Sequence, residues 1–388
     1  MKYPGIWAPV LPCGQNTAPS ASFRRTDRTD HGVVAEDLFK ESGCAGHGEK
    51  VLPICICGYN EGFDEFMLTL SSLVEQQMEL REHGWKTRVL IALDGWQLCS
   101  GSMRQFCFNA FPTETFGDWS EELECTRCTG IALHRTITFS KVNGDAELVE
   151  MELTIYIKSQ NRKKHDTILL FLTGFVKHAL PQADLCFMTD CGSWFAEGCL
   201  KRLVRHMIVH PKCAGATGRI RVAQRCPKGT GRFDSWEGWA CLAAQSAEAE
   251  IGLAASLDLA TRCGFMPVLH GPCQMWRISL ITCRSSGSQA EADGKKCPPT
   301  QAKMSADAPF KSPPVDTLSS LGSTRSADSA TIFACTMEAS MQSPELMQAN
   351  LQLSEDRILS MAVFSSSTSN LSDTELNWVP LAVFYYQA

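Results

Sequence analysis

Four acidic positions in the sequence have residue types and surroundings that suit chemistry. Glu61, Asp94 and Asp190 each lie just beyond a short apolar run that is typical of a buried strand. The fourth position is the run Glu355-Asp356-Arg357, which directly precedes apolar residues at helical spacing. In parallel sheets with helical crossovers, ligands bind beyond the carboxyl ends of the strands. We therefore expect the first three carboxylates to lie in one ligand site.

Asp356 is the candidate general base. A carboxylate can remove a proton when it lies beside the reacting hydroxyl and has a suitable pKa. Glu355 and Arg357 flank it, and the guanidinium of Arg357 would keep the carboxylate ionised. The alternative interpretation is an acidic pair at a helix N-terminus, where the macrodipole favours negative charge.

Asp190 is the candidate metal ligand. A hard cation such as Mg²⁺ takes oxygen ligands, often one or two carboxylates together with phosphate oxygens. Gly192, two residues on, would let a ligand approach the backbone. The same Asp can instead cap the following helix. We expect Mg²⁺ or Mn²⁺ as the cofactor.

A basic polar cluster, Lys158 to Lys164, follows a predicted strand. Such a cluster can hold a diphosphate through charge-assisted hydrogen bonds, although it can also be a solvated charged turn. The turn Gly271-Pro272-Cys273 lies beside Trp276 and could form the floor of an acceptor groove, because sugar rings pack on apolar faces. The alternative there is a plain turn next to a core Trp.

The predicted elements place these residues at strand ends. Apolar runs and turn residues predict strands at 51–57, 88–93, 184–189, 213–222 and 265–269, a hairpin within 130–160 around Asn143-Gly144, and helices at 66–78, 165–180, 196–209 and 236–257. Strand, helix and strand in this order favour parallel βαβ units. The expected fold class is therefore α/β, with a mostly parallel sheet flanked by helices.

Composition sets the domain organisation and excludes some functions. The chain has 388 residues, a net charge of −6 and 44% hydrophobic residues, so no basic field favours nucleic acid as a partner. We expect an irregular extension at 1–48, a catalytic domain at 49–283, a Ser/Pro-rich disordered insertion at 284–349, and a continuation of the catalytic domain at 350–388. No apolar run reaches the roughly 18–20 residues of a membrane span, so we expect this chain to be soluble and cytoplasmic.

The order of the motifs resembles chitin synthases, which are processive family-2 glycosyltransferases with a GT-A nucleotide-diphospho-sugar transferase domain. The matching stretches are Cys57-Gly58-Tyr59-Asn60-Glu61, Leu93-Asp94-Gly95, Lys158 to His165, Thr189 to Ser193, Ala216-Thr217-Gly218, His270 to Cys273 with Arg277, Leu353 to Leu359, and Trp378-Val379-Pro380. The resemblance covers about residues 50–283 and 350–388.

The resemblance implies a role for each matched position. Tyr59 and Glu61 would line the uridine pocket, Asp94 would pair with the uracil, and Lys158 would approach the phosphates. Asp190 would ligate the metal, and Gly271, Pro272 and Cys273 would lie near the acceptor. Asp356 would deprotonate the 4-hydroxyl of a growing β-1,4-linked N-acetylglucosamine polymer, with UDP-N-acetylglucosamine as donor and inversion at the anomeric carbon.

The chain also departs from this family. The family carries a Gln-x-x-Arg-Trp motif shortly after the segment that matches Trp378 to Gln387, and it carries transmembrane helices that form a polymer channel. We therefore expect a partial catalytic domain, with any contact to a plasma membrane made through segments missing from this chain. Two alternatives stay open: a hyaluronan- or cellulose-type processive transferase, and an inert nucleotide-sugar-binding fragment.

Overall fold

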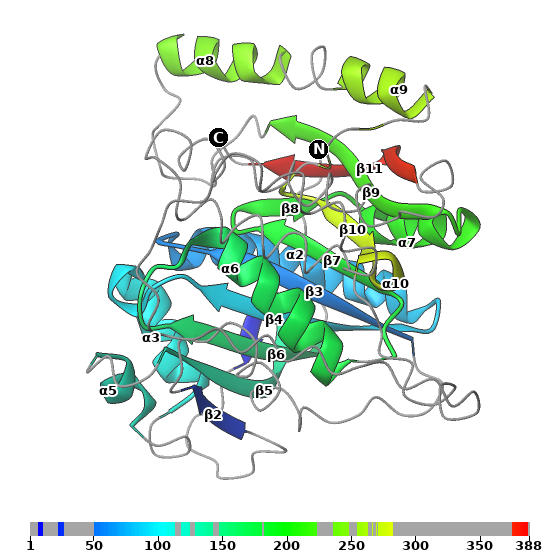
Figure 1. Cartoon of the computed structure of the whole chain (residues 1–388). Helices are drawn as coiled ribbons and strands as arrows, with labels where there is room; N and C mark the ends of the chain where they lie inside the picture. Colours follow the sequence, from blue (N-terminus) through cyan, green and yellow to red (C-terminus); the bar gives the residue numbers. More distant parts are fainter. Residues whose placement is uncertain are drawn as a thin grey trace, which may run out of the picture.

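One mixed sheet organises the part of the chain that the structure describes. A computed structural model describes residues 7–10, 22–26, 50–112, 118–124, 129–142, 147–180, 182–222, 236–247, 254–262, 266, 269, 271–281 and 375–386. Within these ranges the strands are β1 (Trp7–Val10), β2 (Ser22–Thr26), β3 (Lys50–Gly58), β4 (Trp85–Leu93), β5 (Gly130–Lys141), β6 (Leu148–Lys158), β7 (Leu185–Asp190), β8 (Ser193–Phe195), β9 (Cys213–Val222), β10 (Gln274–Arg277) and β11 (Glu375–Tyr386). Figure 1 shows them with helices on both faces.

The helical elements cover the sheet or connect its strands. They are α2 (Phe63–Arg81), η1 (Trp96–Leu98), α3 (Gly101–Ala110), α5 (Trp119–Glu124), α6 (Lys163–Leu169), the π-helix η2 (Leu170–Ala179), α7 (Cys199–Val209), α8 (Trp236–Ala247), α9 (Ala254–Arg262) and α10 (Ile278–Ile281). Among the described helices, none has both the length and the apolar character that a bilayer crossing requires.

The centre of the sheet is parallel, in the spatial order β6-β4-β3-β7. From β3 the chain moves outward to β4 and then to the antiparallel pair β5 and β6, and it returns to pair β7 on the other side of β3. The direction of the crossovers therefore reverses between β3 and β7, and such a reversal leaves a crevice at the carboxyl ends of the strands. On the flanks, β5 and β10 pair antiparallel with β6 and β7. The expected α/β class is confirmed, with a mixed sheet.

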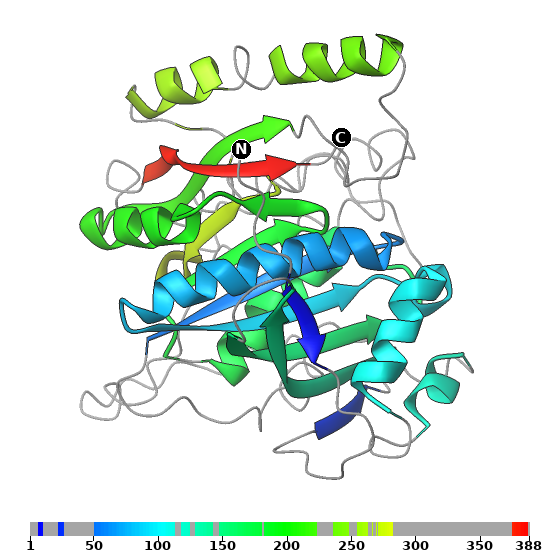
Figure 2. The same cartoon turned by 180° about the vertical axis from the view of Figure 1, so that it is seen from behind.

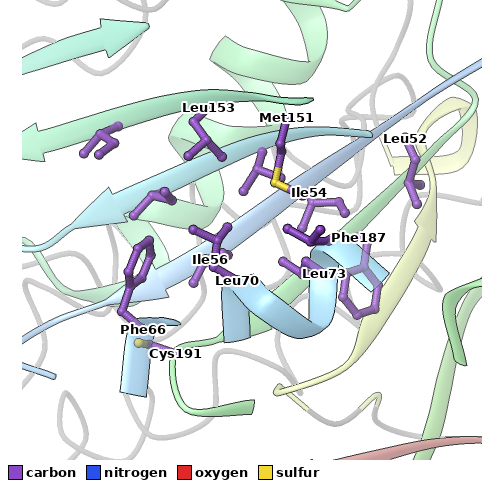
Figure 3. Close-up of a cluster of buried hydrophobic side chains, with 14 of the residues drawn as sticks. Leu52, Ile54, Ile56, Phe66, Leu70, Leu73, Met151, Leu153, Phe187 and Cys191 are labelled. Atoms are coloured by element: carbon purple, nitrogen blue, oxygen red, sulfur yellow. The ribbon is translucent and has the colours of Figure 1, made fainter. Parts of the chain in front are cut away.

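Alternating residues of β3 enter two separate hydrophobic cores. Leu52, Ile54 and Ile56 face α2 and pack in one cluster with Leu70 of that helix and Phe187 of β7, as Figure 3 shows. Figure 2 shows α2 lying across this face. Val51 and Cys55 join the core on the opposite face, where α6 and η2 pack. Burial on both faces explains the continuous apolar run in the sequence, because helices cover both sides of a parallel sheet. Packing in these two cores fixes the position of β3 in the sheet, and therefore the point at which the strand ends and its polar residues begin.

Most predicted elements are present, with some differences. The predicted helix at 165–180 is divided into α6 and the wider turns of η2. The strand predicted at 265–269 is wrong for Met266 and Leu269, the two described residues of that range, and the strand begins instead at Gln274. Two strands of the expected irregular extension, β1 and β2, pair with β5.

The strand β11 was not predicted from the sequence. It runs parallel to β9, with Glu375 opposite Cys213, and antiparallel to β8, with Phe384 opposite Phe195. Its register shifts between Val379 and Val383, around Pro380, whose nitrogen cannot donate a hydrogen bond to the ladder. The end of the sequence therefore holds β8, the strand that follows Asp190, within the sheet.

Candidate functional site

A pocket of about 460 Å³ lies at the carboxyl ends of the central strands. This volume is in the range of small-molecule sites, roughly 300–1,000 Å³. The pocket is lined by Cys57, Gly58, Tyr59 and Glu61 after β3, by Asp94 after β4, by Asn161, Lys163, Lys164 and Thr167 after β6, and by Asp190 and Cys191 at the end of β7. The structure thus brings together the three carboxylates that the sequence places at strand ends.

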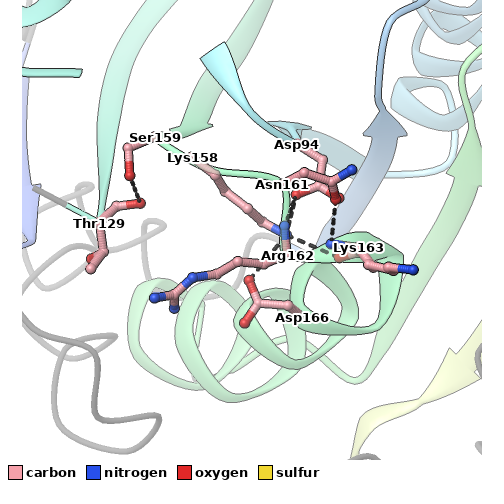
Figure 4. A network of polar contacts seen from close by, with 8 residues as sticks. All are labelled: Asp94, Thr129, Lys158, Ser159, Asn161, Arg162, Lys163 and Asp166. Atoms are coloured by element: carbon pink, nitrogen blue, oxygen red, sulfur yellow. Dashed lines mark hydrogen bonds and ion pairs between the residues drawn. The ribbon is translucent and has the colours of Figure 1, made fainter. Parts of the chain in front are cut away.

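Asp94 is held by backbone and side-chain donors. The residue is only 5% exposed. Its Oδ1 accepts a hydrogen bond of 2.7 Å from the backbone N–H of Arg162 and lies 3.2 Å from Lys158 Nζ. Its own N–H donates to Gly58 O at 3.0 Å, which ties the end of β4 to the end of β3. Figure 4 shows Asp94 facing the loop that connects β6 to α6.

Lys158 is fully buried beneath the pocket and does not line it. Its ammonium lies 3.0 Å from Asp166 Oδ2 and donates to Lys163 O at 3.1 Å, in addition to its contact with Asp94 (Figure 4). A buried ammonium with these partners compensates the charge of Asp94 and fixes the turn before α6. The resemblance implies contact between Lys158 and the phosphates, and that role stays a prediction. The lysines of the cluster that line the pocket are Lys163 and Lys164.

Lys164 and Asp190 form an ion pair inside the pocket. Lys164 Nζ is 2.9 Å from Oδ1 and 3.2 Å from Oδ2 of Asp190, so it contacts both carboxylate oxygens. Asp190 is fixed by its strand, because the next N–H, that of Cys191, donates to Cys57 O at 3.0 Å. Gly192 then turns with φ of 86° and donates its N–H to Thr69 Oγ1 at 2.9 Å.

The pocket suits a cation that takes one carboxylate from the protein and its remaining oxygen ligands from a bound molecule. Among the described residues, no group of three or more His, Cys, Asp or Glu side chains is arranged as a metal cage. Mg²⁺ is commonly bound by one or two carboxylates plus substrate phosphates rather than by such a cage. Asp190, partly exposed in the pocket, can supply that carboxylate.

Glu61 lies on the wall of the pocket nearest β3. Burial raises the pKa of its carboxyl above the ordinary value of 4.5, and the negative charges of Glu65 and Asp190 raise it further. The N–H of Tyr59 opposes this shift by donating to Glu61 Oε2 at 2.5 Å. Tyr59 itself is 42% exposed, so its ring is available to a ligand that enters the pocket.

Two backbone conformations shape the wall after β6. Gly95 has φ of 102°, and a Cβ there would lie 3.1 Å from the backbone nitrogen of Asn161, so a side chain would disturb this close approach. Lys163 has φ of 68°, which is uncommon for a residue with a side chain. The side chain of Asn161 accepts a hydrogen bond from Lys163 N–H at 2.9 Å and supports this turn.

The turn predicted at the acceptor is anchored to the strand that carries Asp190. Thr189 Oγ1 donates to Pro272 O at 2.8 Å, and Thr217 Oγ1 donates to Cys273 O at 2.7 Å. Gly271, Pro272 and Cys273 do not line the 460 Å³ pocket. Trp276 is fully buried and donates to Gln274 Oε1 at 3.1 Å, so it belongs to the core and does not form the floor of a groove.

The candidate base, Asp356, and its neighbours Glu355 and Arg357 lie outside the described residues. Sequence reasoning gave no role to three residues that the structure places in or beside the pocket. Thr167 lines the pocket itself. Asp166 pairs with Lys158, and Thr189 anchors Pro272. An acidic residue two positions after the basic cluster was the available signal for Asp166, whereas a Thr inside a helix or a strand gave none.

Comparison with known proteins shows which family part of the chain is similar to. Residues 122–296 match the family model for the chitin synthase-like glycosyltransferase domain. The matched range contains Lys158, Asp190 and the turn at 271–273, whereas Glu61 and Asp94 precede it. The resemblance predicted from the sequence is therefore confirmed for this part of the chain.

Solved structures add distant similarities. S. aureus TarS (residues 1–349) in complex with UDP-GlcNAc matches at 10% identity with a TM-score of 0.29, over 59% of this chain and 46% of that chain. A second structure of S. aureus TarS (residues 1–349) matches at 9% identity with a TM-score of 0.29, over 59% of this chain and 48% of that chain. The match thus spans about half the length of those chains. No curated protein shows a significant sequence match.

Proposed function

With a chitin synthase-like glycosyltransferase domain at 122–296 as the premise, we propose that this chain binds UDP-N-acetylglucosamine and transfers the sugar to the 4-hydroxyl of a β-1,4-linked N-acetylglucosamine polymer. The observation that carries the proposal is the pocket in which Glu61, Asp94 and Asp190 meet Lys164 at the point where the crossovers reverse. That arrangement suits a ligand with a polar base at one end and a diphosphate at the other.

Each part of the donor has a counterpart in the pocket. Asp94 has no hydrogen-bond partner for Oδ2 among the described residues, while its Oδ1 is occupied, so Oδ2 is the oxygen that would accept from the uracil N–H. Tyr59 would pack against the base, and Glu61 would lie beside the uridine. Lys163 and Lys164 would face the diphosphate, whose charge they complement.

Asp190 would hold Mg²⁺ or Mn²⁺ beside the diphosphate. The cation would neutralise negative charge that develops on the departing UDP. In the transfer, Asp356 would remove the proton of the acceptor 4-hydroxyl. The hydroxyl oxygen would then form a bond to the anomeric carbon from the face opposite UDP, the bond to UDP would break, and the configuration would invert. The turn at 271–273 would lie near the acceptor terminus.

The proposal is tested by donor turnover on the full chain. The reaction contains UDP-N-acetylglucosamine, a β-1,4-N-acetylglucosamine oligomer and Mg²⁺, and it is followed by UDP release and by the mass of the extended oligomer. We expect extension by single N-acetylglucosamine units and little UDP release from UDP-glucose. The chemistry needs both a donor site and a base, so Asp356→Asn is the matched control and should bind UDP without extending the oligomer.

Two results would contradict parts of the proposal. Turnover of UDP-glucose without turnover of UDP-N-acetylglucosamine would replace the chitin-type assignment by another processive family-2 assignment. Tight UDP binding with no turnover of any donor would indicate a nucleotide-sugar-binding domain.

A further inference from the structure

We infer that Lys164 is an internal counter-ion of Asp190 that makes metal binding at this site depend on a diphosphate ligand. The inference rests on the proposed function and assigns a role to a residue of the same pocket. It begins from the ion pair: the Lys164 ammonium lies within 2.9 and 3.2 Å of the two Asp190 oxygens. A divalent cation bound by Asp190 would need those same oxygens.

The two cations therefore compete for one carboxylate. Both side chains are about a quarter exposed, at 27% for Lys164 and 28% for Asp190, so the pair is partly shielded from water yet open to the pocket. A partly desolvated ion pair is worth more than a pair on the open surface. When no diphosphate is present, the lysine neutralises Asp190 and lowers the affinity of the site for a metal ion.

A diphosphate removes the competition. Lys164 is one of the residues that line the pocket, and its flexible side chain presents three N–H donors that suit phosphate oxygens. Transfer of the ammonium from Asp190 to a phosphate leaves the carboxylate free at the moment when phosphate oxygens arrive to complete a metal shell. Diphosphate and metal should consequently bind with positive coupling, which is reciprocal by thermodynamic necessity.

The test uses two probes, Mn²⁺ alone and UDP in the presence of EDTA, on the full chain. We expect Lys164→Met to bind Mn²⁺ alone about tenfold more tightly than the wild type, because the competing charge is gone. The same variant should bind UDP about tenfold more weakly, because a phosphate partner is gone. Electron paramagnetic resonance measures free Mn²⁺, and calorimetry measures UDP binding. Opposite changes in the two affinities are not produced by general loss of structure.

Three further variants complete the design. Lys164→Arg keeps the charge and should leave Mn²⁺ binding as weak as in the wild type. Lys201→Met removes one charge from an exposed position on α7 and should change neither affinity. The double variant Lys164→Met with Asp190→Asn should lose the tight Mn²⁺ binding, because the ligand itself is removed.

The possible failures are distinguishable. A Lys164→Met variant that binds Mn²⁺ as weakly as the wild type or more weakly would overturn the role of Lys164. So would a loss of both Mn²⁺ binding and UDP binding in this variant. Either result would leave the proposed function standing. A wild-type chain that binds no UDP with Mn²⁺ present would contradict the proposed function and this inference together.

Discussion

Lys158 Nζ lies 3.2 Å from Asp94 Oδ1, and the two side chains are almost completely buried. The relationship follows from the sheet, because Leu93 of β4 is in register with Ile157 of β6 and the next residues along are therefore neighbours. Asp166 contacts the same ammonium from α6. A network of charges thus presents Asp94 to the pocket.

Replacement of Lys158 by Met should strongly destabilise the fold. The change leaves Asp94 and Asp166 without their shared cation in a buried position, and loss of one partner from a buried pair costs about 3–5 kcal/mol of unfolding free energy. Urea denaturation measures the difference. Arg262→Met is the matched control, because its pair with Asp258 is exposed and should contribute at most about 1 kcal/mol. If Lys158→Met is as stable as the wild type, the charge network contributes no net free energy of unfolding.

Glu61→Gln should stabilise the protein at neutral pH. Burial raises the folded-state pKa of Glu61 above 4.5, so the ionised carboxylate is unfavourable in the fold at pH values above that raised pKa. The amide can still accept from Tyr59 N–H and carries no charge. The gain should shrink as pH falls through the raised pKa and vanish below 4.5, where both states are protonated. Thermal unfolding at pH 7.5 and pH 4 measures it, and a gain that grows on acidification would refute the sign.

Asp190→Ala should abolish the part of UDP binding that depends on Mg²⁺ or Mn²⁺. The carboxylate is the protein ligand that we propose for the cation, so UDP affinity should become insensitive to the metal in calorimetry. Asp258→Ala removes an exposed carboxylate on α9 and serves as the control. If metal still strengthens UDP binding in Asp190→Ala, the cation is held elsewhere.

Thr189→Val should affect the acceptor more than the donor. The change removes the hydrogen bond from Thr189 Oγ1 to Pro272 O and should reduce the unfolding free energy by about 1 kcal/mol. Because the freed turn is predicted to lie near the acceptor, KM for the oligomer should rise several-fold while KM for UDP-N-acetylglucosamine stays constant. Thr173→Val, which loses a bond to Leu169 O within the helix at η2, is the control. Equal effects on both KM values would argue against the assignment of the turn.

The central strands could be predicted from the sequence because each is a local signal. The apolar run at 51–57 is buried on both faces, and it ends where polar residues begin. Those boundaries alone placed Glu61, Asp94 and Asp190 at one edge of a sheet. By contrast, β8 has only three residues, and Pro380 interrupts the apolar and aromatic run of β11, so the strand signal of each is weak. Their structure comes from pairing with distant partners.

The division of roles between two lysines could not be predicted. Lys158 and Lys164 belong to one basic cluster, and either could reach a phosphate in an extended turn. The structure separates them because Lys163 adopts φ of 68° and its carbonyl accepts from Lys158. One ammonium is then buried with Asp94, and the other enters the pocket with Asp190.

The pairing of β11 with β8 and β9 has a consequence for how the polypeptide is made. Residues 193–222 leave the ribosome long before residues 375–386. During synthesis the hydrogen-bonding edges of β8 and β9 that pair with β11 are therefore unpaired until β11 has been made. Unpaired edges of this kind are where nascent chains associate with one another. We expect recombinant chains cut before residue 375 to accumulate as aggregates. In such chains β8, the strand that follows Asp190, would lack its pairing with β11, even though all residues that line the pocket would be present.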